Sequence, residues 1–323
     1  MKAMVLAAGL GTRLKPITFE LPKPMVPVLD RPVMAHIVGL LQAQGFDDLI
    51  ANIHHYPDTI RDYFGERLTY RYENELLGTA GGVRNVADFF GDDPVVVVSG
   101  DALTDLDLNA LVERHRSAGG IATLTVKKVA DTREYGVVIH DTEGRIQGFQ
   151  EKPEPAEALS DLGNCGIYCF SPEIFDYFPE TPFADWAEDV FPALLEHDVA
   201  FHVHQIYDYW NDVGSLEELR QGTWDALRGV LKIDVTQTGA DLGEVEVIGY
   251  EPVWVGADVE FGSDVKLMGP VAIGDGCKVG DGAALRETIV FPGTNVEAGE
   301  ILIGAIHGGT GITERMRPLE SLG

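Results

Sequence analysis

Apolar and polar positions change their spacing along the chain. Unbroken apolar runs of about four to eight residues are typical of strands buried on both faces of a sheet, whereas apolar residues three or four apart indicate helices. The runs predict strands at 3–6, 48–52, 95–99, 121–128 and 136–140, and the helical spacing predicts helices at 33–44 and 57–65. This alternation predicts an α/β fold with a doubly wound, mostly parallel sheet that binds ligands at the carboxyl ends of its strands.

A different period begins after about residue 229. Large apolar residues recur every six positions, at Val255, Phe261, Leu267, Ile273, Val279 and Leu285. Four of these six precede a glycine. This period predicts a short left-handed parallel β-helix of about two coils. We therefore predict two domains, residues 1–235 and 236–323, the second ending in a tail after about Gly308 that is either flexible or a docking segment. A short solenoid with exposed ends favours a homo-oligomer, either a dimer or a tetramer.

Composition limits the partners. The chain has 24 Lys and Arg residues against 52 Asp and Glu residues, a formal net charge of −28. Such a surface repels nucleic acid and anionic membranes, so neither is predicted as a partner, and a phosphate ligand needs local positive charge or a metal. The sequence shows no secretory signal and no apolar run long enough to span a bilayer, which predicts a cytoplasmic protein.

The three cysteines are predicted to be structural, and a histidine pair is predicted to be structural or substrate-adjacent. Cys165 and Cys169 lie four apart in an extended segment, so their Cα atoms would be roughly 13 Å apart, too far for a disulfide. Cys277 stands alone, and all three are predicted to be reduced thiols. His54 and His55 are adjacent on a strand and point to opposite faces, so their imidazoles cannot readily share one metal ion.

The first predicted strand runs into a glycine loop at 6–14. Its two glycines let backbone N–H groups turn towards an anion, and Arg13 adds a planar cation for phosphate oxygens. The loop lacks the Lys-Ser/Thr ending of a P-loop, and Leu14 stands where a dinucleotide fingerprint has its third glycine. A plain tight turn therefore stays an alternative. The candidate nucleotide-binding residues in this loop are Leu6, Ala8, Gly9, Gly11, Thr12 and Arg13.

Ten residues beyond the loop's arginine, Lys23 stands between Pro22 and Pro24. The prolines fix φ and stiffen the segment, so the lysine is held in place. A positioned ammonium group there can neutralise charge on the α-phosphate of a nucleotide. A solvated surface lysine is the alternative.

Together, Gly-x-Gly-x-Arg-Leu and Pro-Lys-Pro-Met-x-Pro resemble the sugar-nucleotide pyrophosphorylase family, and the resemblance covers nearly the whole chain. This family includes mannose-1-phosphate guanylyltransferases and glucose-1-phosphate thymidylyl-, uridylyl- and adenylyltransferases. It implies a Rossmann-like sugar-1-phosphate nucleotidyltransferase, with a nucleoside triphosphate and a sugar-1-phosphate as substrates. We expect a phosphate oxygen of the sugar to attack the α-phosphorus in line and pyrophosphate to leave, with no covalent enzyme intermediate.

Two aspartates are the candidate metal ligands. Asp101 closes the apolar strand at 95–99, where such a sheet binds its ligands. The resemblance implies that Asp101 and Asp212 hold Mg²⁺, which needs few carboxylates because waters and phosphate oxygens complete its shell. With Arg13 and Lys23, these acids form the predicted catalytic set. A helix cap and a surface charge are the alternative roles for the two acids.

The segments 149–153 and 164–168 resemble the family's sugar-binding segments. The resemblance implies that Lys152 grips the sugar's phosphate, that Glu151 accepts hydrogen bonds from ring hydroxyls, and that Asn164 hydrogen-bonds the sugar. Gly136 would let the backbone touch the hexose. A solvated Glu151–Lys152 pair and a plain turn at Gly136 are the alternatives.

The segment 75–82 resembles the family's base-contacting segment, in which Gly78 would lie against the base. Glu73 or Glu75 could accept from the neighbouring N1 and N2 donors of guanine, whereas a backbone carbonyl can satisfy the single N3–H of uracil or thymine. This favours GTP with mannose-1-phosphate. Glucose-1-phosphate with dTTP, UTP or ATP stays open, as does guanylyl transfer to an unusual sugar or cyclitol phosphate. Either glutamate could instead be solvated.

Two other functional classes fit the sequence less well. Left-handed β-helices often carry acyltransferases, which resemble one another in using a histidine of the helix, but no histidine lies between His204 and His307. A non-catalytic regulatory subunit would be indicated by the loss of a motif acid or lysine, and none is lost.

Overall fold

A computed structural model describes residues 1–236, 242–308 and 312–315, and in it the chain divides into two units. The first comprises Met1–Leu10, Pro22–Pro24 and Met34–Asp212, and the second comprises Gly11–Leu21, Met25–Val33 and Val213–Gly323. The predicted domain boundary at residue 235 stays a prediction. Most of the predicted tail, residues 309–311 and 316–323, lies outside the described residues.

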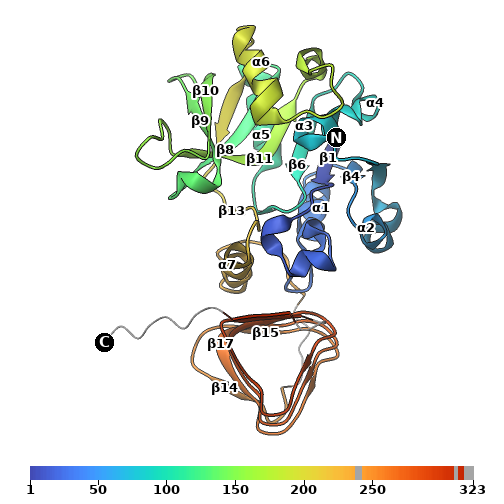
Figure 1. The fold of residues 1–323 in the computed structure, drawn as a ribbon, viewed down its shortest axis with the longest axis vertical. Helices are drawn as coiled ribbons and strands as arrows, with labels where there is room; N and C mark the ends of the chain where they lie inside the picture. Colours follow the sequence, from blue (N-terminus) through green and yellow to red (C-terminus); the bar gives the residue numbers. More distant parts are fainter. Residues whose placement is uncertain (237–241, 309–311, 316–323) are drawn as a thin grey trace. The chain divides into compact units, whose positions relative to one another are not determined.

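The first unit is built on a nine-stranded sheet (Figure 1). The strand order is β10-β9-β11-β6-β1-β4-β5, and β8 pairs with both β11 and β12. The strands are β1 (Lys2–Ala7), β4 (Asp48–Ile53), β5 (Thr69–Tyr72), β6 (Val95–Ser99), β8 (Ala122–Lys128), β9 (Gly136–His140), β10 (Ile146–Glu151), β11 (Leu162–Phe170) and β12 (His202–Gln205). A separate short pair joins β7 (Leu103–Thr104) to β13 (Trp210–Asn211).

Strands β5, β4, β1 and β6 run parallel, and β11 is inserted antiparallel between β6 and β8. The predicted fold class is confirmed, with this antiparallel insertion added. Leu6 at the end of β1 lies opposite Asn52 of β4 on one side and Ser99 of β6 on the other. The carboxyl ends of β1, β4 and β6 therefore lie at one edge of the sheet. This is the edge at which the sequence predicts a ligand site.

Helices of the first unit flank this sheet (Figure 1). They are α1 (Val33–Ala43), α2 (Pro57–Phe64), α3 (Gly78–Arg84), α4 (Ala87–Phe90), α5 (Leu108–Ala118) and α6 (Phe191–Glu196). Helix α5 shows how the sequence sets an element: Asp107 caps its start by accepting from Ala110 N at 3.0 Å, and Gly119 ends it at φ 71°. Its buried Leu108 and Leu111 face the core.

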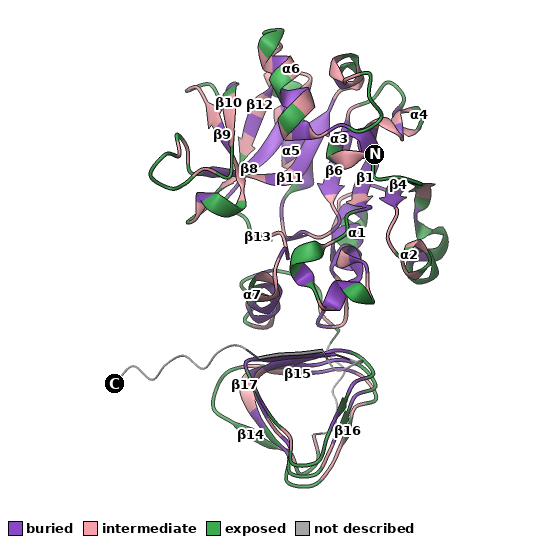
Figure 2. Ribbon diagram, in the orientation of Figure 1, coloured by how far each residue is buried: buried purple, intermediate pink, exposed green. Residues whose placement is uncertain are grey.

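The core of this unit combines aliphatic strands with a group of aromatic rings. Figure 2 shows β1, β6 and β11 largely in the colour of buried residues. In β6 the residues Val95–Val98 are all buried, each contributing roughly 1.5–3 kcal/mol by leaving water. Trp186 stacks on Phe170 and Phe191 with ring centroids 4.4 and 5.5 Å apart. A rigid, apolar sheet therefore supports the polar strand ends.

The second unit contains a parallel β-helix, which Figure 1 shows end-on as a triangle. Its coils pair in parallel, and β22 and β23 end it as an antiparallel pair. The strands are β14 (Glu246–Ile248), β15 (Val253–Val255), β16 (Glu260–Phe261), β17 (Lys266–Ile273), β18 (Lys278–Val279), β19 (Ala284–Val290), β20 (Asn295–Val296), β21 (Ile301–Ile303), β22 (Ala305–Gly308) and β23 (Ile312–Arg315). This unit also holds β2 (Pro27–Val28), β3 (Arg31–Pro32) and α7 (Leu216–Leu227).

The six-residue period points its apolar residues inwards, as predicted: Leu267, Ile273 and Leu285 are fully buried. The glycines that follow have a packing reason. A Cβ added at Gly256 would lie 2.7 Å from Asp275 N, which belongs to the next coil, so only a glycine fits there.

Among the residues that the structure describes, no helix is both long and apolar enough to cross a lipid bilayer. The three cysteines are buried and free, which confirms that they are unpaired. Burial raises the pKa of the Cys169 thiol to about 12, so this thiol stays protonated at neutral pH.

Candidate active site

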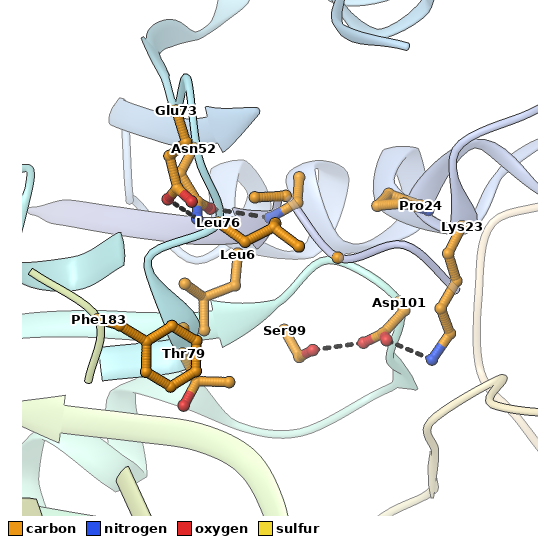
Figure 3. Close-up of a pocket in the computed structure, with 14 residues that line it drawn as sticks. Leu6, Lys23, Pro24, Asn52, Glu73, Leu76, Thr79, Ser99, Asp101 and Phe183 are labelled. Carbon is orange, nitrogen blue, oxygen red and sulfur yellow. Dashed lines mark hydrogen bonds and ion pairs between the residues drawn. The ribbon is translucent and has the colours of Figure 1, made fainter. Parts of the chain in front are cut away.

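A cavity of about 310 Å³ opens at the carboxyl ends of β1, β4 and β6 (Figure 3). All of its lining residues belong to the first unit. Those expected from the sequence are Leu6, Ala8, Gly9, Lys23, Glu73, Gly78 and Asp101. Those that the sequence did not single out are Ala7, Pro24, Asn52, Leu76, Thr79, Ser99 and Phe183. The cavity therefore brings together candidate residues from distant segments of the chain.

An ion pair lies in this cavity. Lys23 Nζ contacts Asp101 Oδ2, and Ser99 Oγ donates to Asp101 Oδ1 (Figure 3). The side chains of Lys23 and Asp101 are only 13% and 22% exposed, so their attraction is weakly screened. In a chain of net charge −28, Lys23 brings a positive charge into the cavity, where Asp101 is its ion-pair partner.

Glu73 lies inside a buried hydrogen-bond network. Its Oε1 accepts from Asn52 Nδ2 at 2.7 Å, and its Oε2 accepts from Leu77 N at 3.2 Å. Asn52 Oδ1 in turn accepts from Ala7 N at 2.9 Å. Glu73 is 2% exposed and Asn52 3% exposed. Both carboxylate oxygens of Glu73 therefore have protein donors. Through Asn52, the network also joins the end of β1 to the segment before α3.

Glu73→Ala is expected to lower the free energy of unfolding by about 2 kcal/mol, because it leaves the buried Asn52 amide and the partly buried Leu77 N–H without their acceptor. Chemical denaturation of both proteins measures this difference. Glu75→Ala is the matched control, because Glu75 is exposed, and its unfolding midpoint should equal that of the wild type. Equal stability of Glu73→Ala and wild type would contradict a structural role for this network.

Gly78 begins α3 with φ +77°, a conformation that side chains rarely adopt. A Cβ added there would lie 2.4 Å from the carbonyl oxygen of Ala184 and 3.2 Å from Cε2 of Phe183. The position therefore has to be glycine, and it places bare backbone against the cavity.

A second cavity of about 270 Å³ lies beside the first. It contains four of the residues expected to bind the sugar phosphate or metal: Gly136, Glu151, Asn164 and Asp212. Its other lining residues are Glu134, Tyr135, Phe149, Gln150, Gly166, Tyr168 and Ala187. A Cβ added at Gly166 would lie 3.4 Å from the Cβ of Ser99, a lining residue of the first cavity. The walls of the two cavities are therefore neighbours where β11 pairs with β6.

Several side chains that line the second cavity carry polar groups. A Cβ added at Gly136 would lie 3.0 Å from Glu151 Oε2, so the glycine leaves this carboxylate accessible. Asn164 Nδ2 donates to the hydroxyl of the buried Tyr168 at 3.0 Å. Asp212 follows β13, and its Oδ1 atom is buried. Hydroxyl-rich ligands suit these acceptors.

Five candidate residues line neither of these cavities in the described part of the chain: Gly11, Thr12, Arg13, Glu75 and Lys152. The first three belong to the second unit. Glu75 is exposed. Lys152 has φ 45° and an exposed side chain, with its Nζ 3.6 Å from Glu151 Oε1. Their proposed roles stay predictions.

His54 is structural, as expected: its Nδ1 donates to the carbonyl oxygen of Glu73 at 2.8 Å. Of the residues that the sequence missed, Asn52 had a signal, because it is a polar side chain between apolar residues near the carboxyl end of β4. Phe183 had none, because it lies in an irregular loop about a hundred residues beyond Gly78.

The donor set fits Mg²⁺ better than a metal held by protein alone. Within the described ranges, no three His, Cys, Asp or Glu side chains gather as a metal-binding group. Such a group would be needed for Zn²⁺ or Ca²⁺, whereas Mg²⁺ is commonly bound through one or two carboxylates with waters and substrate phosphates. Asp101 already attracts a cationic group, the Lys23 ammonium.

Comparison with known proteins gives a consistent result. A family model described as "Nucleotidyl transferase" matches residues 2–228. The chain is 37% identical to a UTP–glucose-1-phosphate uridylyltransferase of Synechocystis, over 94% of this chain and 86% of that protein. It is 33% identical to a mannose-1-phosphate guanylyltransferase of Mycobacterium tuberculosis, over 93% of this chain and 82% of that protein. A crystal structure of an apo UDP-glucose pyrophosphorylase shares the fold, with a TM-score of 0.62 and 21% identity over 71% of this chain and 99% of that one.

Proposed function

This chain belongs to the nucleotidyl transferase family, and we propose that it transfers a nucleotidyl group from a nucleoside triphosphate to a sugar-1-phosphate, releasing pyrophosphate. The observation that carries the proposal is the pair of adjoining cavities in one unit. One holds the Lys23–Asp101 pair beside apolar walls, which suits a nucleotide. The other is lined by hydroxyl acceptors, which suits a sugar.

The transfer needs no side-chain nucleophile, because the sugar phosphate is itself an anionic nucleophile. One of its oxygens forms a bond to the α-phosphorus while the bond from that phosphorus to the bridging oxygen of pyrophosphate breaks. The protein's part is to hold two anions in line, and such positioning can lower the barrier by roughly 7–11 kcal/mol. Lys23 offsets negative charge at the α-phosphate, and Ser99 orients the Asp101 carboxylate.

Asp101 and Asp212 are the proposed holders of Mg²⁺. When bound, the ion would supply positive charge for the triphosphate oxygens. Arg13 is proposed to add a further cation for the phosphates, and Glu151 and Asn164 to bind sugar hydroxyls. Soluble substrates of this kind need neither nucleic acid nor membrane as a partner. A cytoplasmic location and a homo-oligomeric state are proposed with the activity.

Glu73 bears on the choice of base. The expectation of GTP with mannose-1-phosphate relied on Glu73 or Glu75 to read guanine. Both oxygens of Glu73 accept from protein donors, and Glu75 lines neither cavity in the described part of the chain. A base that needs only backbone partners, such as uracil, is therefore favoured. The uridylyltransferase relative is also slightly more similar to this chain than the guanylyltransferase relative. We place UTP with glucose-1-phosphate first and GTP with mannose-1-phosphate second.

A matrix of ATP, GTP, CTP, UTP and dTTP against mannose-, glucose-, galactose- and N-acetylglucosamine-1-phosphate, with Mg²⁺, tests this order. Pyrophosphate release with UTP and glucose-1-phosphate is expected to exceed that of every other pair. Turnover confined to GTP and mannose-1-phosphate would overturn the order, would keep the reaction, and would make Glu75 the base-reading candidate to mutate.

Lys152→Ala is expected to raise KM for the sugar phosphate about tenfold, with KM for the nucleotide unchanged, because one charge-assisted contact to the phosphate is lost. Initial rates at varied sugar phosphate measure this. Lys128→Ala is the matched control, because Lys128 is also an exposed lysine paired with a carboxylate, Asp161, and should behave as wild type. An unchanged KM for the sugar phosphate in Lys152→Ala would remove Lys152 from this role.

A further inference from the structure

Phe183 is an apolar ring that lines the first cavity although it remains 54% exposed. An aromatic side chain of this size usually hides most of its surface in a core. Cavities that bind small molecules, by contrast, commonly present apolar and aromatic walls to the ligand. Phe183 differs from other exposed rings of the described chain, such as Tyr207, in lining this cavity, so its unburied face is available to a ligand there.

The loop that carries this ring is held firmly from one side by a single arginine. Arg84, at the end of α3, donates to the carbonyl oxygens of Pro179, Thr181 and Pro182 at 2.6, 2.6 and 2.7 Å. Three charge-assisted hydrogen bonds to carbonyls within four residues of the loop leave little freedom for its backbone. The exposure of Phe183 is thus a property of an ordered loop.

On its other side the loop is joined to the start of α3. The carbonyl oxygen of Ala184 accepts from Ala80 N and Gly81 N, both at 3.0 Å, and Ala184 N donates to Leu77 O at 2.9 Å. The loop therefore accepts from two N–H groups in the first turn of α3. The ring is carried next to Gly78, whose added Cβ would lie 3.2 Å from Phe183 Cε2.

The cavity has two chemically different ends. Figure 3 shows the Lys23–Asp101 pair at one end and Phe183 beside Thr79 at the other. Leu6 and Leu76 add apolar surface to the same cavity. A ligand with a charged part and a flat apolar part can satisfy both ends at once. A nucleoside triphosphate has this shape, with its phosphates matched to the lysine and its base matched to the ring.

We propose that Phe183 packs its ring against the base of the bound nucleotide and so contributes to nucleotide affinity. The proposal rests on the proposed function, because it takes the first cavity to be the nucleotide site. Every base has a π face, so the contact strengthens binding without selecting one base. Because the loop is already ordered, the ring loses little freedom when the base arrives.

Phe183→Ala is the central test. With the triphosphate that the wild type prefers, KM for the nucleotide is expected to rise about tenfold. This is the typical loss of affinity when an aromatic side chain that stacks on a base is truncated to alanine. KM for the sugar phosphate and kcat should change less than about twofold, because neither the second cavity nor the Lys23–Asp101 pair is touched. Phe183→Tyr and Phe183→Trp keep a ring and should retain a nucleotide KM near that of the wild type.

Inorganic tripolyphosphate, which has no base, provides a second measurement. Its inhibition constant against the nucleotide should be the same in wild type and Phe183→Ala. Tyr207→Ala is the control variant, because Tyr207 is 87% exposed and lines neither cavity in the described part of the chain. Its kinetics should match those of the wild type.

The outcomes separate the two proposals. An active wild type whose nucleotide KM is unchanged in Phe183→Ala would overturn the stacking contact and leave the proposed function standing. Weakened tripolyphosphate inhibition in that variant would also overturn it, because the defect would then extend to the phosphates. A wild type that turns over no nucleotide with any sugar phosphate would overturn the proposed function itself.

Discussion

Asp101→Asn should lower kcat about a thousandfold while the protein stays folded. Asp101 is a largely buried carboxylate beside Lys23, at the edge where β1, β4 and β6 end. Its replacement removes the negative charge that orients the lysine and that would hold Mg²⁺. Preorganised electrostatic groups of this kind are worth about a hundred- to a thousandfold each in rate, and here one substitution affects two of them. Steady-state rates at saturating substrates give the comparison.

The fold should tolerate this change, because Asn has nearly the same size and its side-chain oxygen can still accept from Ser99 Oγ. Asp92→Asn is the matched control, since Asp92 is an exposed acid on the loop that precedes the same strand. The control should keep the wild-type rate. A wild-type kcat in Asp101→Asn would remove Asp101 from the catalytic set.

Lys23→Met should lower kcat about a hundredfold. Methionine preserves the length and most of the apolar stem but removes the ammonium group that contacts Asp101 and would neutralise the α-phosphate. In a chain of net charge −28, the loss of this charge also leaves the carboxylate of Asp101 without its cationic neighbour. Lys128→Met, at an exposed lysine outside the cavities, serves as the control.

The double variant Asp101→Asn with Lys23→Met makes the comparison sharper. Because the two side chains touch, their effects should not add, and the double variant should be about as slow as Asp101→Asn alone. Fully multiplicative losses would mean that the two residues act independently, which their contact in the structure does not lead us to expect.

Much of the first unit could be predicted because its strands carry strong local signals. The unbroken valines of β6 predict a strand buried on both faces. Ser99 ends that strand and Asp101 follows it, which predicts polar groups at the ligand-binding edge. The inserted antiparallel strand β11 could not be predicted in this way. An apolar run has the same pattern in either direction, and only the partners in space set its course.

The part of the first cavity that is proposed to hold the nucleotide base could not be predicted, for a similar reason. The sequence offered Glu73 and Glu75 as equivalent acids, and the fold buries one in a network with Asn52 while the other stays exposed. Phe183 reaches Gly78 only because Arg84 and α3 hold its loop there. Contacts between segments about a hundred residues apart leave no periodic trace in the chain.

The β-helix shows the opposite case, in which a six-residue period predicts the parallel coils that it covers. The prediction of about two coils was too short, because β14, β17, β19 and β21 stack in parallel on one face. Even its irregularity has a counterpart in the structure. Met268 interrupts the glycine series, and the register between β17 and β19 shifts between Met268 and Val271. An added residue in one coil changes the local register, and the glycine that would pack against the next coil is displaced.

The central claim is direct transfer between two bound substrates, and product stoichiometry tests it most directly. The full chain is incubated with Mg²⁺, the preferred triphosphate and its sugar-1-phosphate, and nucleotide sugar and pyrophosphate are quantified together by anion-exchange chromatography. We expect equal amounts of the two products, and neither product when either substrate is left out. Pyrophosphate released without sugar phosphate, or no product from any pair of substrates with folded protein, would contradict the account.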